Sequence, residues 1–558
     1  MRPIFLLAAL VVSLVPSGQL QARQPVRARH AMVVSREAHA TDAGVAVLRA
    51  GGNAVDAAVA VGFALAVTHP SAGNIGGGGF MLIRLADGAT TFLDFRERAP
   101  GKASRDMYLG PDGKPTQDSV TGYRASGVPG TVRGFETAWK KYGRKPWAEL
   151  VAPAIELASK GFPVSYGLAT GLRSAARRME AFPESRRIFL NGGKFYEMGD
   201  NFVQPDLAAT LSRIAAQGAK DFYEGETARK LAKAMADNGG TITLDDLKNY
   251  TVVERKPLTG QYHGYDIITA PPSSSGGIGI LQMLGMLEGT GYEKGGAGSA
   301  SEIHWTAEAM RRYFADRAQY LGDADFVKVP VAGLLDRDYI AGLRKTIDPE
   351  KATPSSQVRA GDPPGYESSE TTHYSIVDAE GNAVSVTYTL NNSYGSAVTA
   401  PGLGFLLNDE MDDFAAKPGS PNMFGLVQGE ANAIQPNKRP LSSMTPTIVL
   451  RNGKLYLVAG SPGGPTIITA VLETIQNVLD FGMNIQDAVD WPRFHHQWMP
   501  DKLYIEPGIS PDTIALLKAR GYDVEIRRSM GEVAAILVNG DWLQGAADPR
   551  SEGKAAGY

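Results

Sequence analysis

A chain of 558 residues is too long for one ordinary hydrophobic core, so two or more structural units are expected. Hydrophobic residues make up 43% of the chain and charged residues 21%, which is typical of a globular protein. The net charge of -3 gives no indication of binding to nucleic acid or to an anionic membrane. The lack of cysteine excludes disulfides, thiolate metal sites and cysteine nucleophiles.

Residues 1–22 are typical of a secretory signal peptide. Arg2 precedes an apolar run at 4–15, and Pro16 follows that run. Spanning a bilayer takes roughly 20 apolar residues, so this run is too short. Cleavage is expected near Ala22, at an imperfect small-x-small site, and an uncleaved anchor is the alternative. We therefore expect a periplasmic or secreted protein without stable membrane insertion.

The start of the mature chain is expected to form two helices and then two strands. A first helix is predicted at 41–50, with Thr41 as its N-cap. Asn53 is expected to cap a second helix that runs to about Thr68 and is apolar on nearly all sides, which indicates burial. After a run of four glycines, two strands around a hairpin turn are predicted at 80–85 and 90–95.

The middle of the chain, from about 130 to 350, is mostly helical in pattern and is interrupted by a loop at 271–277. Helices are predicted in this region at 131–142, 147–160 and 302–320. Residues 353–370 are rich in Pro, Ser, Gly, Asp and Glu, which indicates a linker. Beyond it the pattern changes to strands, predicted at 373–377, 383–389, 445–450 and 455–460, with a helix after Pro465.

Common catalytic motifs do not occur in this sequence. It contains no Gly-x-Ser-x-Gly elbow and no complete dinucleotide or Walker loop. The glycine run at 76–79 is more typical of close packing or a turn than of a phosphate site. His495 and His496 lack the i, i+4 spacing of helical metal ligands, so a structural role is favoured and no metal site is predicted.

The most informative stretch is the junction between the acidic linker and a strand, where Thr371 and Thr372 follow Glu370. Taken alone, two threonines at the start of a strand reflect β-propensity. Longer motifs give the junction its meaning, because nearly the whole mature chain resembles the γ-glutamyltranspeptidase family of N-terminal-nucleophile hydrolases. The motifs that carry the resemblance are Asp94–Glu97, Thr371–Ser375, Asp378–Val384, Val386–Asn391, Asn408–Phe414, Pro436–Met444, Gly460–Gly464, Pro492–Trp498 and Asp548–Ser551.

The resemblance implies an α/β fold, the four-layer αββα sandwich of N-terminal-nucleophile hydrolases. It also implies a zymogen that cleaves itself between Glu370 and Thr371. The products would be a large subunit, 23–370, and a small catalytic subunit, 371–558. The two would remain together as a heterodimer, with both contributing strands to the paired sheets.

The implied catalyst is Thr371. A threonine hydroxyl needs a base near neutral pH, and the α-amino group freed by cleavage, with a pKa of about 7.7 to 8.0, can act as one. Thr389 matches the family threonine that orients the nucleophile. Gly463 and Gly464 match the backbone N–H pair of the oxyanion hole, where glycine permits close approach of the backbone.

The implied substrate-binding residues fit a γ-glutamyl head group. Arg96 matches the ligand of the α-carboxylate, which Ser442 and Ser443 also contact, and a guanidinium can bind a carboxylate bidentately. The ammonium ligands would be Asn391, Glu410 and Asp413. Two positions depart from the bacterial pattern. Phe424 stands in the lid where tyrosine is common, so a latching hydroxyl is lost, and Glu410 stands where glutamine is common.

The activity implied is attack by Thr371 on the γ-glutamyl amide of glutathione or a similar compound. The acyl group would pass to water or to an amino-acid or peptide acceptor, with no cofactor and no nucleic acid involved. One alternative is a glutaryl or cephalosporin acylase on the same scaffold, against which Arg96 and Asp413 argue, because an acyl group without the ammonium leaves Asp413 unpaired. The other is a non-catalytic periplasmic binding protein, against which the complete catalytic set argues.

Overall fold

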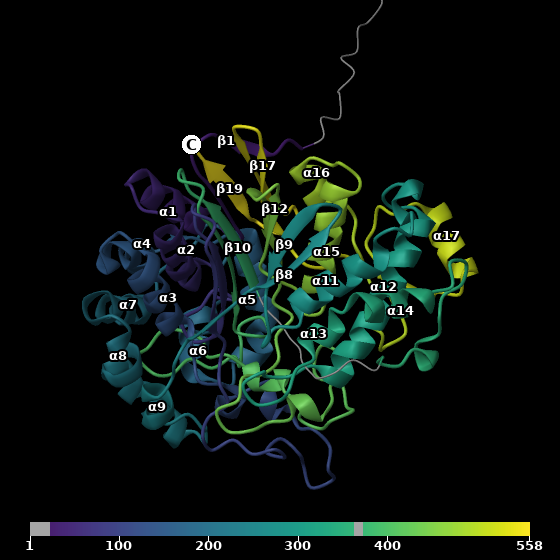
Figure 1. Cartoon of the computed structure of the whole chain (residues 1–558). Coiled ribbons are helices and arrows are strands. Elements are labelled where there is room, and N and C mark those ends of the chain that lie inside the picture. The colour runs from purple at the N-terminus through teal and green to yellow at the C-terminus, as the bar shows by residue number, and fades with distance from the viewer. Residues whose placement is uncertain (1–22, 362–371) are drawn as a thin grey trace, which may run out of the picture.

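The computed structural model describes residues 23–361 and 372–558. Two seven-stranded antiparallel sheets lie face to face, and helices cover the outer face of each (Figure 1). The predicted four-layer αββα architecture is therefore confirmed. The predicted signal peptide and the predicted cleavage site, Glu370 and Thr371, lie outside the described residues.

Both sheets interleave strands from before and after the predicted junction. The first sheet has the order β19 (Lys554–Gly557), β2 (Met32–Ser35), β10 (Thr372–Val377), β11 (Ala383–Thr389), β3 (Gly78–Arg84), β4 (Thr90–Phe95) and β7 (Val253–Arg255). The second has the order β1 (Val26–Ala28), β18 (Trp542–Ala547), β17 (Ala534–Asn539), β13 (Lys454–Gly460), β12 (Thr447–Arg451), β9 (Tyr265–Thr269) and β8 (Leu258–Tyr262). Neither part of the chain forms either of these two sheets by itself.

Three hydrophobic layers follow from the alternation of side chains along the strands. In β3, Phe80 and Leu82 point into the space between the sheets, whereas Met81 and Ile83 point toward the helices. Both faces of this strand are fully buried, which explains its continuous apolar run.

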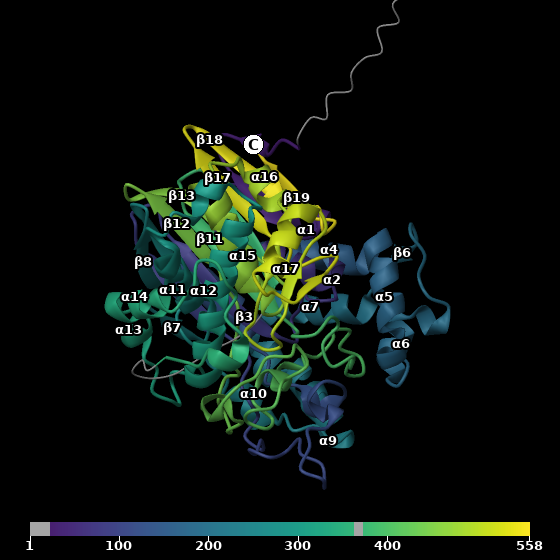
Figure 2. The same ribbon diagram turned by 90° about the vertical axis from the view of Figure 1, so that its right-hand side faces the viewer.

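The helices divide between the two outer layers (Figures 1 and 2). The first sheet is covered by residues from α1 (Ala38–Arg49), α2 (Ala54–Thr68), α3 (Thr131–Tyr142), α4 (Trp147–Lys160), α5 (Tyr166–Met179), α6 (Pro183–Phe189), α7 (Pro205–Gln217), α8 (Ala219–Glu224), α9 (Glu226–Asp237) and α10 (Leu244–Lys248). The second is covered by α11 (Gly276–Leu287), α12 (Ala300–Tyr320), α13 (Val331–Leu334), α14 (Arg337–Lys345), α15 (Thr466–Leu479), α16 (Ile485–Asp490) and α17 (Pro511–Ala519). Smaller sheets comprise β5 (Phe162–Pro163) with β6 (Asn201–Phe202), and β14 (Phe494–His495), β15 (Leu503–Ile505) and β16 (Val524–Ile526).

The helix caps confirm one prediction and correct another. Asn53 caps α2 in a capping box with Asp56, as predicted. The N-cap of α1 is Glu37 and not Thr41, because the Glu37 carboxylate accepts hydrogen bonds from the N–H groups of residues 39 and 40. The Thr41 hydroxyl instead contacts the Ser35 hydroxyl at 2.7 Å.

The glycine run at 76–79 serves close packing, as predicted. A Cβ atom on Gly77 would lie 1.9 Å from the carbonyl oxygen of Thr389, and one on Gly79 would lie 2.4 Å from that of Thr387. Any larger residue would push β3 away from the end of β11. The glycines therefore hold the start of β3 against the strand that ends at Thr389.

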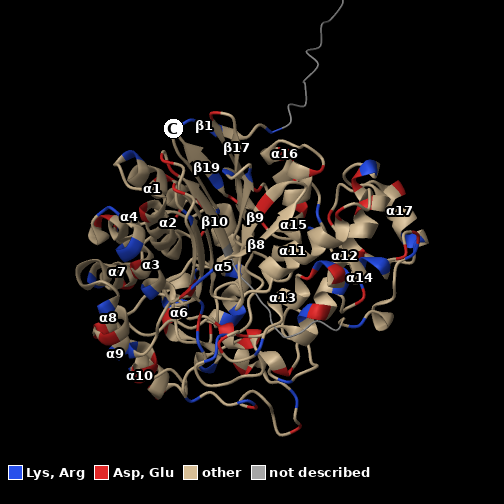
Figure 3. Cartoon of the chain, viewed as in Figure 1, with Lys and Arg blue, Asp and Glu red and all other residues tan. Residues whose placement is uncertain are grey.

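Basic and acidic side chains are mixed over the outer helices, and the sheets between them carry few of either (Figure 3). Among the described residues, no helix combines the length and the apolar character that crossing a membrane requires.

Candidate active site

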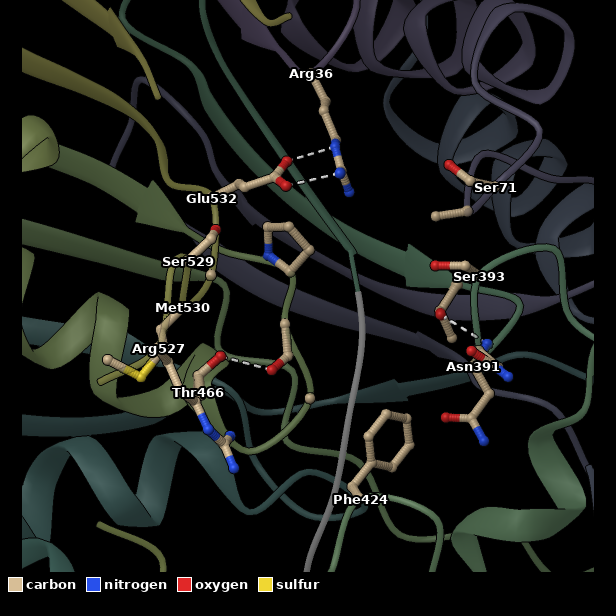
Figure 4. Close-up of a pocket in the computed structure, with 17 residues that line it drawn as sticks. Arg36, Ser71, Asn391, Ser393, Phe424, Thr466, Arg527, Ser529, Met530 and Glu532 are labelled. Atoms are coloured by element: carbon tan, nitrogen blue, oxygen red, sulfur yellow. Dashed lines mark hydrogen bonds and ion pairs between the residues drawn. The ribbon is translucent and has the colours of Figure 1, made fainter. Parts of the chain in front are cut away.

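A cavity of about 350 Å³ brings five of the predicted site residues together (Figure 4). It lies beside the end of β11 and the start of α15, where the two sheets meet the loops that follow them. The predicted residues that line it are Thr389, Asn391, Phe424, Gly463 and Gly464.

Gly463 and Gly464 form the turn between β13 and α15. Their φ angles of 130° and 62° lie in the region that favours glycine. A Cβ atom on Gly463 would lie 2.6 Å from Thr466 Oγ1. Within the described residues, neither N–H has a hydrogen-bond partner. Since α15 starts directly after this turn, its dipole favours negative charge here, and the pair can receive an oxyanion.

Thr389 is the last residue of β11 and is held from two sides. Its Oγ1 accepts a hydrogen bond of 2.8 Å from the backbone N–H of Asn391. Its carbonyl oxygen accepts one of 2.7 Å from Asn74 Nδ2. In the antiparallel pairing of β10 with β11, Thr372 lies opposite Tyr388. Thr389 therefore lies one residue beyond the first pair that the structure describes between these two strands.

The charged residues predicted to bind the head group form a separate, deeper cluster. Arg96 follows β4, and Glu410 and Asp413 begin and end the 3-10 helix η6 (Glu410–Asp413). Nη1 of Arg96 donates to Glu410 Oε1 at 2.5 Å, and Nη2 donates to Asp413 Oδ2 at 2.5 Å. All three side chains are almost completely buried. The structure therefore pairs the predicted carboxylate ligand with two of the predicted ammonium ligands.

Glu97 belongs to this cluster, and no role was predicted for it. Its carboxylate is fully buried, with Oε2 3.6 Å from Arg96 Nη1, and neither oxygen accepts a hydrogen bond from an N–H or O–H group of the described residues. Burial raises the pKa of Glu97 to about 7, against the attraction of Arg96. Its place in the motif Asp94–Glu97, beside an arginine, was the signal that could have identified it.

The pKa values of the other charged groups in the cluster are shifted by burial and by the same neighbouring charges. Burial raises the pKa of Glu410 well above its usual range, opposed by Arg96 and reinforced by Glu97 and Asp413. The pKa of Arg96, which burial alone would lower, is raised by the surrounding carboxylates. The cluster thus keeps a cation charged while favouring protons on its acids.

Besides the two oxygens of Glu97, each predicted ammonium ligand has one buried acceptor atom that receives no hydrogen bond from the described residues. These atoms are Asn391 Oδ1, Glu410 Oε2 and Asp413 Oδ1. Buried acceptors without partners are uncommon and unfavourable, so a set of them indicates a binding function. An ammonium group has three N–H donors and no acceptor.

Ser442 and Ser443 are fully buried, and the residue before them contacts the cluster. Nη2 of Arg96 donates to the carbonyl oxygen of Leu441, one residue earlier, at 3.3 Å. The backbone of Ser442 is held by Ser273 and Ser275, and Ser443 Oγ lies 3.5 Å from Arg317 Nη2. The segment that carries both predicted serines therefore contacts Arg96 at Leu441.

Phe424 lines the cavity from another loop, and its carbonyl oxygen accepts a hydrogen bond of 3.2 Å from Gln497 Nε2. His495 and His496 are buried away from this cavity. Nδ1 of His495 lies 3.1 Å from Thr469 Oγ1, and Nε2 of His496 lies 3.2 Å from Asp501 Oδ1. Within the described parts of the chain, no group of His, Asp and Glu side chains could hold a metal ion.

Known proteins share this sequence and fold. The family model described as Gamma-glutamyltranspeptidase matches residues 40–558. The glutathione hydrolase proenzyme of Escherichia coli (strain K12) is 52% identical over 538 residues, which are 96% of this chain and 93% of that protein. The solved structure of a cephalosporin acylase from Bacillus halodurans has a TM-score of 0.86 and 27% identity, covering 96% of this chain and 97% of that one. For the γ-glutamyltranspeptidase of Helicobacter pylori the TM-score is 0.58 and the identity 46%, with coverage of 62% and 97%.

Proposed function

The chain belongs to the γ-glutamyltranspeptidase family, and on that premise we propose how its residues perform the reaction. The protein is an autoprocessed γ-glutamyltransferase and glutathione hydrolase of the N-terminal-nucleophile type. Its substrates are glutathione and other γ-glutamyl compounds, and its acceptors are water, amino acids and peptides. It works in the periplasm or outside the cell after loss of residues 1–22.

Maturation begins when the hydroxyl of Thr371 attacks the carbonyl carbon of Glu370. The peptide bond breaks as an ester forms, and water then hydrolyses the ester to leave a carboxylate on Glu370 and a free amino group on Thr371. The large subunit, 23–370, and the small subunit, 371–558, remain a heterodimer. The interleaved strands support this, because separating the two parts would break both sheets.

In catalysis the free amino group of Thr371 takes the hydroxyl proton, directly or through water, as the oxygen attacks the γ-carbonyl. Thr389 orients the nucleophile, and the N–H groups of Gly463 and Gly464 stabilise the oxyanion. Collapse of the tetrahedral intermediate expels the amine, which takes up a proton, and leaves an acyl-enzyme. Attack by water or by an acceptor amine then releases the γ-glutamyl group and restores Thr371. Phe424 covers the pocket as its lid.

The observation that carries this proposal is the set of unpaired acceptors beside a paired arginine. A γ-glutamyl head group brings one ammonium and one carboxylate. Its ammonium satisfies the free oxygens of Asn391, Glu410 and Asp413. Its carboxylate takes the place of one carboxylate on Arg96, and Ser442 and Ser443 donate to it. A glutaryl group lacks the ammonium and would leave those acceptors buried and unpaired.

The first test compares the purified wild-type protein with Thr371→Ala by denaturing gel and intact mass. The wild type should give two fragments in place of the 59.5 kDa chain, the smaller beginning at Thr371, and the variant should stay uncut. The wild type should release p-nitroaniline from the γ-glutamyl anilide and far less from the glutaryl anilide. An uncut, inactive wild type would refute the mechanism, and a preference for the glutaryl anilide would support the acylase alternative.

A further inference from the structure

The active-site cavity has one wall that the chemistry of the γ-glutamyl group does not use. The loop between β16 and β17 forms it, with Arg527, Ser529 and Met530 on the side of the cavity opposite Asn391 and Ser393 (Figure 4). The volume of about 350 Å³ is in the range of small-molecule sites, roughly 300 to 1,000 Å³. The cavity is therefore large enough to hold part of a ligand beyond the reacting carbonyl group.

Two arginines line this part of the cavity, and they differ in their partners. Arg36 is paired with Glu532, since its Nε and Nη2 lie 2.5 and 2.7 Å from the two carboxylate oxygens (Figure 4). The charge of Arg36 is thus largely compensated within the protein.

Arg527 has no such partner. Its guanidinium carbon lies 3.3 Å from the centroid of the Tyr504 ring, and its Nε lies 3.9 Å from Glu525 Oε1. Its guanidinium donates no hydrogen bond to another described residue, and its side chain is 42% exposed. Stacking on the ring fixes the plane of the guanidinium while its N–H groups stay available to a ligand.

We infer that Arg527 binds the C-terminal carboxylate of the peptide portion of γ-glutamyl peptides and of peptide acceptors. The inference rests on the proposed function, because it assumes that the γ-glutamyl carbonyl lies at Gly463 and Gly464. Thr466 donates to the carbonyl oxygen of Gly463 at 2.6 Å and lies on the same side of the cavity as Arg527 (Figure 4). An extended dipeptide spans about 7 Å, so its carboxylate can reach the cavity wall while its amide nitrogen is at the reacting carbon.

The experiment compares glutathione with its C-terminal amide, which keeps the γ-glutamyl bond and loses only the terminal charge. The measured quantity is the ratio of kcat/KM for glutathione to kcat/KM for the amide. In the wild type this ratio should be about five to ten, as expected for a partly exposed charge-assisted contact. It should fall to about one in Arg527→Gln and be partly restored in Arg527→Lys.

Arg528→Gln is the matched control, since Arg528 is the next residue, is exposed and does not line the cavity. It should keep the wild-type ratio. A wild-type ratio in Arg527→Gln would overturn the inference. So would an equal loss of kcat/KM for both substrates, which would indicate a structural role. A wild type that cleaves neither these substrates nor the γ-glutamyl anilide would refute the proposed function instead.

Discussion

Replacing Glu97 by glutamine should change how the stability of the protein depends on pH. The pKa of Glu97 is raised from 4.5 to about 7 by burial, so the folded protein holds this proton more tightly than the unfolded chain. A raised pKa stabilises the fold fully below about pH 4.5, and this stabilisation is lost as the pH rises through about 7. Glutamine has the same shape but does not titrate.

The shift sets the size of the effect. A rise from 4.5 to about 7 corresponds to about 3 kcal/mol of stability, most of it lost between pH 5 and pH 8. Between pH 5 and pH 8, the free energy of unfolding of the parent should therefore fall by about 2 to 3 kcal/mol more than that of Glu97→Gln.

The assay is urea denaturation, followed by tryptophan fluorescence, at steps between pH 5 and pH 8. Thr371→Ala serves as the parent, so that one uncut chain unfolds in each case. Glu149→Gln, at an exposed position, is the control and should follow the parent at every pH. If Glu97→Gln also follows the parent, the buried carboxyl does not carry the extra proton and the reasoning about this cluster is wrong.

Three further substitutions test other parts of the site. In Gly463→Ala the new Cβ would lie 2.6 Å from Thr466 Oγ1 and 2.9 Å from Gly531 Cα, which displaces the oxyanion donor. The kcat for γ-glutamyl anilide should therefore fall about 100-fold, and a wild-type kcat would contradict the assignment. Arg96→Ala leaves the buried carboxylates without their cation, so it should lose about 3 to 5 kcal/mol in urea denaturation, and a loss below about 1 kcal/mol would argue against the ion pairs. Phe424→Tyr adds a hydroxyl that can latch the lid and exclude water, so transfer to glycylglycine should increase relative to hydrolysis; an unchanged product ratio would exclude this role.

Local sequence patterns were sufficient where neighbouring residues determine the structure. The helices at 131–142 and 147–160 and the strand at 90–95 have the predicted bounds, because the apolar period alone defines them. The cap of α1 was predicted wrongly, because a glutamate outside the usual capping residues accepts the N–H bonds and Thr41 turns to the neighbouring strand.

The predicted active-site residues came from the resemblance and not from local patterns of residues. Thr371 alone is one of two threonines before a strand, and its role followed only from the order of long motifs around it. Gly463 and Gly464 taken alone indicate only a turn, and their predicted role also came from the resemblance. The structure adds their positive φ angles and their position at the start of a helix.

The sequence by itself indicated the family, the layered fold, the predicted nucleophile and the predicted head-group ligands, because the order of its motifs along the chain carries the resemblance. Only the tertiary structure decided how these motifs meet. Arg96 and Glu410 are separated by 314 positions in the chain, yet their side chains lie 2.5 Å apart. The burial of Glu97 and the exposure of Arg527 on the cavity wall also depend on packing between distant segments. Charge pairing and desolvation act through space, and the order of residues along the chain does not record them.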